Sequence, residues 1–331
     1  MKKKMRIIWL DDNPSRVRST KNMEETISVE VKFIDLKGAI LNDKLIELLE
    51  SPKPDLIIVD HVLDKIDMSA DGLIRSGSTV AEIVREKWLN CPIIGVTAAT
   101  PVDDVDLQKK SLYEALYPFE ELSVHYNSIL SIAKSFQVLT KRNLKNLSDL
   151  LKLLKCPKDD KIRLEAVIPD DLRSDYGNQS LPISISRWVR YILMGRPGFL
   201  YDSIWSATLL GIKEKSFEKV KHLFKEARYN GIFADESNER WWQTGIREIL
   251  YKKDSIEGFQ NTRNLGRQLP KITKKDYSVC YACKGDQPEI VGYTDEKGDT
   301  RVQLHLRCSD THPNFERSLY FEEIRMMKGA E

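Results

Sequence analysis

Long apolar runs are missing from this sequence of 331 residues. No stretch approaches the ~18 to 20 apolar residues that a membrane-spanning helix needs. The apolar residues behind the N-terminal lysines end at Leu10, which is too early for a signal peptide. A charge excess is missing as well, since 52 Lys and Arg face 50 Asp and Glu, so any basic surface must be local. We therefore expect a soluble, cytoplasmic protein with no membrane contact.

Cysteine is also scarce, and its odd count argues against a disulfide framework. There are five cysteines, two of which form a closely spaced pair at positions 280 and 283. A metal site in a reducing compartment fits this usage better. Common enzyme motifs are missing too, because the sequence has no phosphate-binding glycine loop, no nucleophile elbow and no His-Glu-x-x-His pair. The sequence therefore gives little support to an enzyme.

What the first 123 residues do contain is an alternation of short apolar runs with amphipathic stretches. This pattern predicts buried strands at 6–10, 29–34, 55–59 and 92–96, and helices at 14–26, 37–49 and 79–88. Asn13 and Pro14 suit the N-cap and the first position of the first helix. Continuous apolar strands that alternate with helices are typical of a parallel sheet covered on both faces. We therefore predict an α/β fold with a doubly wound parallel sheet for residues 1–123.

Oxygen-bearing side chains follow three of these strands. Asp11 and Asp12 come after the first strand, Asp60 after the third and Thr97 after the fourth. The carboxyl ends of parallel strands meet at one edge of a sheet, which is where such sheets bind ligands. Crowded carboxylates need a cation, and hard oxygen ligands suit Mg²⁺. A carboxylate beside bound Mg²⁺ can attack a phosphoryl group and hold it as an acyl phosphate.

Residues 1 to about 135 resemble a response-regulator receiver domain. The resemblance is carried by the segments Ile-Ile-Trp-Leu-Asp-Asp-Asn, Asp-Leu-Ile-Ile-Val-Asp, Ile-Ile-Gly-Val-Thr-Ala and Tyr-Pro-Phe-Glu-Glu-Leu. It implies a flavodoxin-like fold in which Asp60 is the phosphoacceptor and a histidine kinase is a possible partner. It also implies that Asp11, Asp12 and the carbonyl of Val62 bind Mg²⁺, and that Thr97 is the switch hydroxyl.

Two features depart from this family. Tyr117 stands where the family has a Lys, so a hydroxyl replaces a full positive charge. The segment 64–76 is longer than usual and forms either a lid or docking loop beside Asp60, or a surface insertion without a role. Two interpretations follow. Asp60 accepts a phosphoryl group, or the pocket is a phosphate-independent docking platform that holds Mg²⁺ or receives an Arg or Lys from a partner.

The sequence of residues 124–160 predicts one long helix or two helices in series. Apolar residues repeat at spacings of three and four over 124–155, first at Ile129, Ile132, Phe136 and Leu139. This stripe suits either a dimerising coiled coil or a helix packed on its own domain.

The next segment, 161–270, predicts a mostly helical domain. Helices are expected at 185–193, 201–210, 216–227 and 241–251. Ser216 is the expected cap of the third. Basic residues gather over 240–275 with Trp241, Trp242 and Phe259 among them. This mixture could bind nucleic acid through phosphates and base stacking. The alternative is a solvated linker whose tryptophans belong to the core of the bundle.

The last segment, 271–331, carries a cysteine–histidine cluster. Cys280 and Cys283 are followed by His305 and Cys308, with His312 as an alternative to His305. One strand is predicted at 289–294, between the cysteine pair and His305, and a second at 300–306, which contains His305. A helix is expected after 313. Thiolate and imidazole groups at these spacings suit tetrahedral Zn²⁺ in a closed, structural site. We predict a small α+β zinc-binding module that resembles a treble-clef finger, with free thiols as the alternative.

Together these features favour a signalling adaptor. Its receiver-like domain would accept a phosphoryl group or dock a protein partner, and its helical and zinc-binding parts would bind another macromolecule as output. One alternative is a DNA-binding transcriptional regulator of a two-component system. A second is an effector or enzyme subunit of a bacterial stress or antiphage defence operon. The only enzymatic step that we predict is phosphorylation of the receiver-like domain from a phosphodonor.

Overall fold

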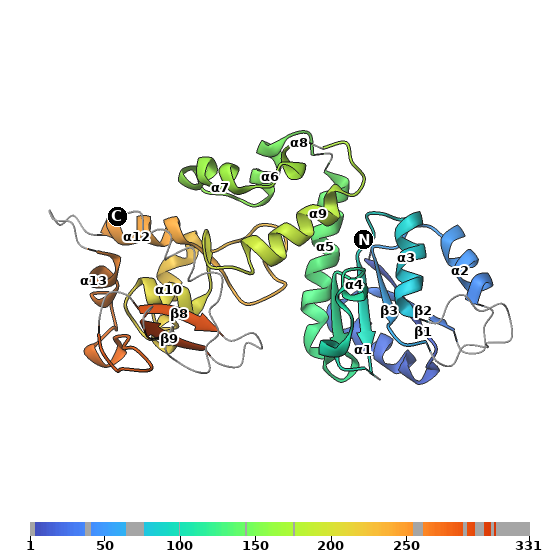
Figure 1. Cartoon of the computed structure of the whole chain (residues 1–331), viewed down its shortest axis with the longest axis horizontal. Helices are drawn as coiled ribbons and strands as arrows, with labels where there is room; N and C mark the ends of the chain where they lie inside the picture. Colours follow the sequence, from blue (N-terminus) through green and yellow to red (C-terminus); the bar gives the residue numbers. More distant parts are fainter. Residues whose placement is uncertain are drawn as a thin grey trace. The chain divides into compact units, whose positions relative to one another are not determined.

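The computed structural model describes residues 4–36, 41–63, 76–98, 100–142, 144–174, 176–253, 261–286, 290–294, 301–305 and 308. The chain forms two compact units (Figure 1). Unit 1 consists of Met1–Asp149, Pro169–Arg187 and Asp235–Ser237, and unit 2 of Leu150–Ile168, Trp188–Ala234 and Asn238–Glu331. The expected lid at 64–75, the aromatic residue at 259, the candidate ligand at 312 and the expected helix after 313 lie outside the described residues.

Unit 1 is built on a five-stranded parallel sheet with the order β2-β1-β3-β4-β5. The strands are β1 (Arg6–Asp11), β2 (Glu30–Asp35), β3 (Leu56–Asp60), β4 (Ile93–Thr97) and β5 (Ala115–Pro118). The first four confirm the predicted strands. The fifth is short and half-buried along its whole length, so its sequence lacks the apolar run that marks the others. This strand order is the flavodoxin-like one, which confirms the predicted fold class.

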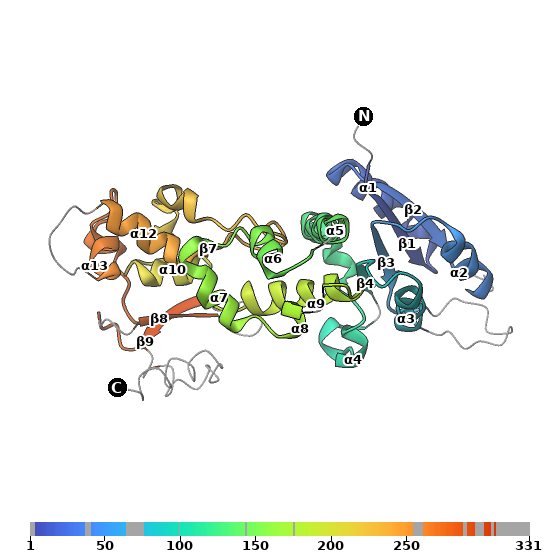
Figure 2. The ribbon, with the colours of Figure 1, turned by 90° about the horizontal axis from the view of Figure 1, so that it is seen from above.

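Helices cover both faces of this sheet (Figure 2). They are η1 (Pro14–Arg16), α1 (Val17–Ile27), α2 (Leu41–Glu50), α3 (Gly77–Lys87), η2 (Val102–Asp104), α4 (Leu107–Lys110), η3 (Phe119–His125) and α5 (Tyr126–Lys141). On one face, α2 and α3 bury Leu45, Leu48 and Val84 against apolar side chains of β1, β3 and β4. On the other face, α1 and α5 contact each other. Asn13 caps the first helical turn and Pro14 begins it, as predicted.

The segment after residue 123 forms two helices in series. The first is α5, and the second is α6 (Leu147–Leu153). The apolar stripe of α5, which includes Ile129 and Phe136, is buried, and α5 contacts α1 and α9 (Leu181–Arg187) of its own unit. The stripe therefore packs on its own domain, and it is not exposed for a dimerising coiled coil over 124–155.

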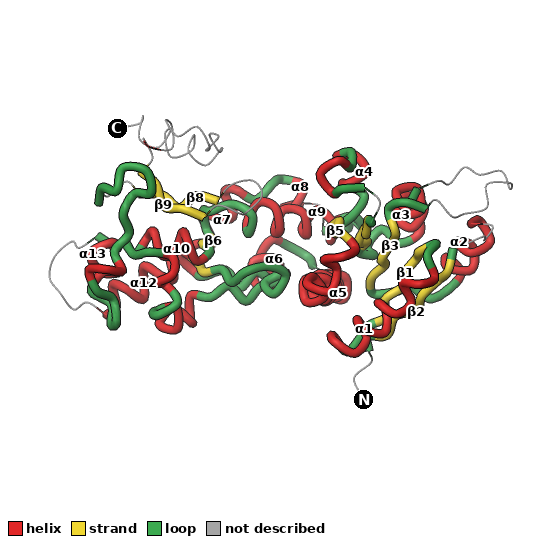
Figure 3. The backbone as a smooth tube through the Cα atoms, turned by 90° about the horizontal axis from the view of Figure 1, so that it is seen from below, coloured by secondary structure: helices red, strands yellow, loops and turns green. Residues whose placement is uncertain are grey.

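Unit 2 is mostly helical (Figure 3). Its helices are η4 (Lys158–Asp160), α7 (Lys161–Val167), η5 (Trp188–Leu193), α10 (Ser203–Leu209), α11 (Glu214–Phe217), η6 (Lys221–Ala227), α12 (Gln243–Lys253), α13 (Thr262–Arg267) and η7 (Lys274–Asp276). The remaining short helix, α8 (Asp171–Ser174), belongs to unit 1. A core around Phe217, Val220 and Ile246 holds α10 to α13 together. The described helices include none with the length and apolar character needed to span a bilayer.

Two predictions about these helices are wrong in detail. The helix expected at 216–227 is broken between α11 and η6, and it is kinked again inside η6, where the buried Phe224 has non-helical torsions. Ser216 is not its cap, since its hydroxyl donates to Asp276. The helix expected at 241–251 begins only at Gln243, because Trp241–Trp242 (β7) pairs as a strand with Leu200–Tyr201 (β6).

A hairpin ends the described chain. Its strands β8 (Ile290–Thr294) and β9 (Arg301–His305) are antiparallel and confirm the predicted pair. The hairpin packs on α10, where the Gln303 amide donates to Thr208 Oγ1 and to the carbonyl of Ile212, each at 2.9 Å. The cysteine–histidine segment is therefore packed against the helical part of unit 2.

Candidate functional site

Three buried carboxylates lie together at the carboxyl edge of the sheet. Asp11 ends β1, Asp12 follows it, and Asp60 ends β3. Ligand oxygens of all three lie within 4.8 Å of one another, and each residue is at most 4% exposed. The structure thus brings together the three carboxylates that the strand pattern pointed to.

The carboxylates already have a cation from their own chain. Nη1 of Arg16 lies 2.7 Å from Asp11 Oδ2 and 2.6 Å from Asp60 Oδ2. Its guanidinium also lies 4.4 Å from the centre of the Phe119 ring, and the residue is only 8% exposed. For the docking interpretation we expected the pocket to hold Mg²⁺ or to receive an Arg or Lys from a partner; in the structure an arginine of the same chain contacts two of its carboxylates. The signal in the sequence was a cation in the first helical turn after the acidic pair.

The charges in this pocket shift one another. Burial and the Asp11 charge raise the pKa of Asp60 to about 7, although Arg16 opposes this. Burial also raises the pKa of Asp11 against the same guanidinium. Burial alone would lower the pKa of Arg16, but the two carboxylates raise it above its ordinary value. Arg16 is therefore charged, and Asp60 is the carboxyl that protonates more readily near neutral pH.

N–H groups of the backbone and of Trp9 also donate to the carboxylates of Asp11 and Asp60. Asp11 Oδ1 accepts the Asn13 N–H at 2.8 Å, and Asp60 Oδ1 accepts the Val62 N–H at 3.3 Å. Trp9 Nε1 donates to Asp11 Oδ2 at 3.2 Å. Val62, whose carbonyl was expected to bind Mg²⁺, therefore touches the Asp60 side chain through its amide. Hard oxygens in this number suit a divalent cation, but Arg16 lies between two of them.

The other two expected side chains have identified contacts. The Thr97 hydroxyl, at the end of β4, donates to the Thr100 carbonyl at 2.8 Å and accepts the Thr100 N–H. The Tyr117 ring stacks on His125 with centroids 4.2 Å apart. The receiver family has a Lys at the position of Tyr117. In this chain the cation that contacts Asp60 is Arg16.

Sequence reasoning also missed the close packing behind Asp60. A Cβ on Gly77, the first residue of α3, would lie 2.0 Å from the Asp60 carbonyl oxygen. The Gly77 N–H donates to the His61 carbonyl at 3.0 Å. The His61 ring in turn contacts the Tyr113 hydroxyl at 3.0 Å. Only glycine allows α3 to begin this close to the strand end.

Comparisons with known proteins reach the fold and no further. No family model matches this chain, and no curated protein does. Among solved structures, it is similar to the N-terminal domain of a response regulator/sensory box/GGDEF protein from Carboxydothermus hydrogenoformans (17% identity, 41% of this chain and 97% of that one, TM-score 0.31). It is also similar to the signal receiver domain of an HD domain-containing protein from Pseudomonas fluorescens (15% identity, 40% of this chain and 99% of that one, TM-score 0.30). A third similar structure is the Mn²⁺-bound form of response regulator Rcp1 (19% identity, 38% of this chain and 92% of that one, TM-score 0.30).

Unit 1 has the receiver fold. The strand order and the three carboxylates at its carboxyl edge establish this in the structure itself. Each of the three matches spans about two fifths of this chain.

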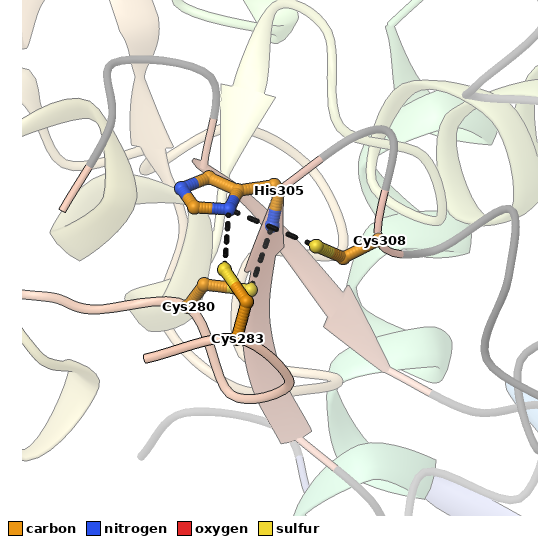
Figure 4. A group of neighbouring side chains, drawn as sticks. All are labelled: Cys280, Cys283, His305 and Cys308. Carbon is orange, nitrogen blue, oxygen red and sulfur yellow. Dashed lines mark hydrogen bonds between the residues drawn. The ribbon is translucent and has the colours of Figure 1, made fainter. Parts of the chain in front are cut away.

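A second group of side chains gathers in unit 2. Cys280, Cys283, His305 and Cys308 place their ligand atoms within 4.8 Å of one another (Figure 4). His305 Nδ1 lies 3.1 Å from Cys283 Sγ and 3.8 Å from Cys308 Sγ, and the His305 N–H points to Cys280 Sγ. Three sulfurs and one imidazole nitrogen are a donor set that fits tetrahedral Zn²⁺.

The local backbone explains how the first two cysteines meet. The Cys280 N–H donates to the Gly285 carbonyl, and the Lys284 N–H donates to the Cys280 carbonyl. Lys284 has a left-handed φ of 60°, which closes this turn. Asp286 then accepts hydrogen bonds from Arg263 and Arg267 of α13. The cysteine turn is thus tied to the helical part of unit 2.

The thiols disfavour ionising together. Burial and the neighbouring Cys280 and Cys283 raise the pKa of the Cys308 thiol. Backbone N–H groups lower the pKa of Cys280, although burial opposes them. Sulfurs that share a small space in this way are suited to a cation that neutralises them all.

The basic stretch at 240–275 does not present its tryptophans to solvent. Trp241 and Trp242 are each 3% exposed, and Trp241 packs edge-on against Phe217 with centroids 4.9 Å apart. Arg240 is also directed inward, since its Nε donates to the Met194 carbonyl. These tryptophans belong to the core of the bundle, which agrees with the second of the two interpretations and leaves them unable to stack on bases.

Proposed function

We propose that this chain is a signalling protein whose receiver domain accepts a phosphoryl group at Asp60. The observation that supports this most is the meeting of Asp11, Asp12 and Asp60 in one buried pocket of a receiver fold. A nucleophilic carboxylate with two carboxylates beside it matches the chemistry that a phosphoacceptor needs.

The reaction is a phosphoryl transfer to a side chain. An oxygen of Asp60 forms a bond to the phosphorus of an acyl phosphate such as acetyl phosphate. The bond between that phosphorus and the acetate oxygen breaks, and acetate leaves. Asp11, Asp12 and the Val62 carbonyl are the groups that would hold Mg²⁺, which offsets charge on the phosphoryl oxygens when bound. The Thr97 hydroxyl, buried at the neighbouring strand end, would turn toward the new phosphoryl group.

We propose that the signal leaves the receiver domain through α9. The Ser186 hydroxyl donates to Glu114 at 3.0 Å, and Glu114, just before β5, is paired with Arg85 of α3 at 2.7 Å. Arg187 also donates to the Ser111 carbonyl. The chain continues directly from α9 into η5 of unit 2. A shift of α3 or β5 would therefore reach the helical region without a separate partner.

Unit 2 is the proposed output. We infer that Cys280, Cys283, His305 and Cys308 hold a structural Zn²⁺. Four such ligands would fill a tetrahedral site and leave no position open for catalysis. A thiolate metal site suits a reducing compartment, and we therefore propose a cytoplasmic location. The division into parts at 1–123, 124–160, 161–270 and 271–331 is our proposal for how input, link, helical output and metal module are arranged.

Intact-mass spectrometry tests the phosphoacceptor. The zinc-loaded chain is incubated with acetyl phosphate and Mg²⁺. We expect the added mass of one phosphoryl group in the wild type and in the surface variant Arg18→Gln, and none in Asp60→Asn. Equal phosphorylation of Asp60→Asn, or none in the wild type at saturating Mg²⁺, would contradict the proposal.

The second candidate is phosphate-independent docking of a protein partner, for which a histidine kinase is one choice. The ion pairs of Arg16 favour it, since they balance the pocket without a metal or a phosphoryl group. An unphosphorylated wild type that still binds its partner, with Asp60→Asn binding equally well, would support docking over phosphorylation.

A further inference from the structure

One guanidinium nitrogen occupies the space between two carboxylates. Arg16 Nη1 contacts Asp11 Oδ2 and Asp60 Oδ2 at once, and these oxygens come from different strands. The opposite oxygens of the two carboxylates accept backbone N–H groups. A cation that bridges Asp11 and Asp60 therefore needs the oxygens that Arg16 now holds.

Arg16 is held in this position from several sides. Its backbone N–H donates to the Asn13 carbonyl at 3.0 Å, within the turn that Asn13 caps. Its guanidinium lies over the Phe119 ring. Both ion pairs are nearly free of solvent, because the side chains of Arg16, Asp11 and Asp60 are 9%, 0% and 5% exposed. Buried contacts of this kind are screened much less by salt and water than pairs on the surface.

We infer that Arg16 is a built-in competitor of divalent cations in the Asp60 pocket. The inference rests on the proposed function, because it concerns the metal that phosphoryl transfer would use. Arg16 and a divalent cation claim the same pair of oxygens, and two such charges cannot share them at contact distance. The pocket thus has one state with Arg16 inward and no metal, and another with the metal bound and Arg16 outward.

The outward state has room. A surface cavity of about 640 Å³ is lined by Arg16 itself and by Arg18, Ser15, Ser19, Asn22 and Phe119. Hydroxyl and amide oxygens there can accept hydrogen bonds from a displaced guanidinium. The Phe119 ring borders both the inward position and this cavity, so it can stay in contact with the guanidinium during the exchange.

Isothermal titration calorimetry with Mg²⁺, and separately with Mn²⁺, tests the competition on the full zinc-loaded chain. Arg16→Gln removes the competing charge, and Lys21→Gln removes an exposed charge of α1 outside the cavity as the control. We expect Arg16→Gln to bind both ions at least about tenfold more tightly than the wild type, since a unit charge within contact distance is removed. Lys21→Gln should bind within about twofold of the wild type, because exposed charges are screened.

An affinity of Arg16→Gln equal to or weaker than that of the wild type would overturn the inference. Circular dichroism shows whether each variant is folded before titration. If Arg16→Gln is not folded without metal, Arg16→Lys replaces it. Lysine keeps the charge, but its nitrogen ends one bond short of the position of Nη1. It should therefore hold the two oxygens less well, and we expect tighter metal binding than in the wild type. Binding at or below the wild-type affinity in Arg16→Lys would overturn the inference in the same way.

The two proposals fail separately. Tighter Mg²⁺ binding in Arg16→Gln together with no phosphoryl mass in any variant would leave the competition intact and reject the phosphoacceptor. Phosphorylation of Asp60 with unchanged metal affinity in Arg16→Gln would do the reverse.

Discussion

At the scale of single residues, the receiver domain solves the problem of burying like charges. Asp11, Asp12 and Asp60 crowd at the carboxyl edge of the sheet, and burial together with the Asp11 charge raises the pKa of Asp60 to about 7. One Arg16 nitrogen bridges two of them. Charges this deep would repel each other without a cation, so the stability of the domain and its ion binding depend on the same residue.

Removing that cation should destabilise the protein when no divalent ion is present. We expect Arg16→Gln to lower the free energy of unfolding by about 3 kcal/mol, the usual cost of leaving a buried partner uncompensated. Addition of Mg²⁺ should recover most of this loss, because a ligand that binds only the folded state stabilises it. Urea denaturation with and without Mg²⁺ measures both effects. A loss below about 0.5 kcal/mol, as expected for the surface variant Arg18→Gln, would show that the pocket does not need Arg16.

The element scale shows which parts of the fold the sequence could predict. Four strands of unit 1 and both strands of the hairpin were predicted because continuous or alternating apolar residues mark them. β5 was not, since each of its residues is half-buried. Trp241–Trp242 was assigned to a helix because its pairing with Leu200–Tyr201 is a long-range contact with no local signal.

The candidate site shows the same division. Asp60 and the two carboxylates after β1 follow from topology, since parallel strands place their ends together. The role of Arg16 did not follow, because a cation in a first helical turn usually faces solvent. Its partner Asp60 lies 44 positions away, and only the packed fold reveals the pair.

Contact between α3 and the end of β3 gives a prediction at this scale. In Gly77→Ala the new Cβ would overlap the Asp60 carbonyl, so α3 must shift and the Asp60 side chain must move with it. We expect a loss of about 2 kcal/mol or more in unfolding free energy, together with weaker Mg²⁺ binding. Gly177→Ala, which meets no atom within 4 Å, is the control in the same unit. Equal stability of the two variants in chemical denaturation would show that the close approach does not constrain the site.

The link between η7 and α11 gives a prediction about acid stability. Asp276 accepts hydrogen bonds from Lys219, Ser216 and Thr273, and these contacts, the ammonium of Lys219 foremost, hold its pKa well below the ordinary range. A depressed pKa in the folded state stabilises the protein above the ordinary aspartate pKa, and this contribution fades as the pH falls below it. We expect Asp276→Asn to lower the Tm at pH 7 and the difference from the wild type to shrink toward pH 3. Thermal melts over this pH range measure it; a difference that grows in acid would contradict the assignment.

At the scale of the whole molecule, the structure separates a unit with the receiver fold from a unit that carries the cysteine–histidine cluster. The two units have their own cores, and the hairpin with its cysteines packs on α10 inside unit 2. Loss of metal should therefore affect unit 2 and leave the receiver domain folded.

Cys283→Ser tests this independence. We expect its zinc content to fall toward zero and the unfolding transition of unit 2 to move to lower temperature, since metal binding contributes directly to folding. Cys156→Ser, outside the cluster, should keep its zinc. Elemental analysis and calorimetry report the two quantities. Full zinc content in Cys283→Ser, or loss of the receiver transition alone, would contradict the arrangement.

The most direct measurement is the position of the phosphoryl group itself. The wild type is treated with acetyl phosphate and Mg²⁺, the acyl phosphate is reduced with borohydride, and the reduced residue is located by peptide mass spectrometry. We expect conversion at Asp60 alone, dependent on Mg²⁺ and lost in Asp60→Asn. Conversion at another carboxylate, or none in a chain shown to bind Mg²⁺, would contradict it.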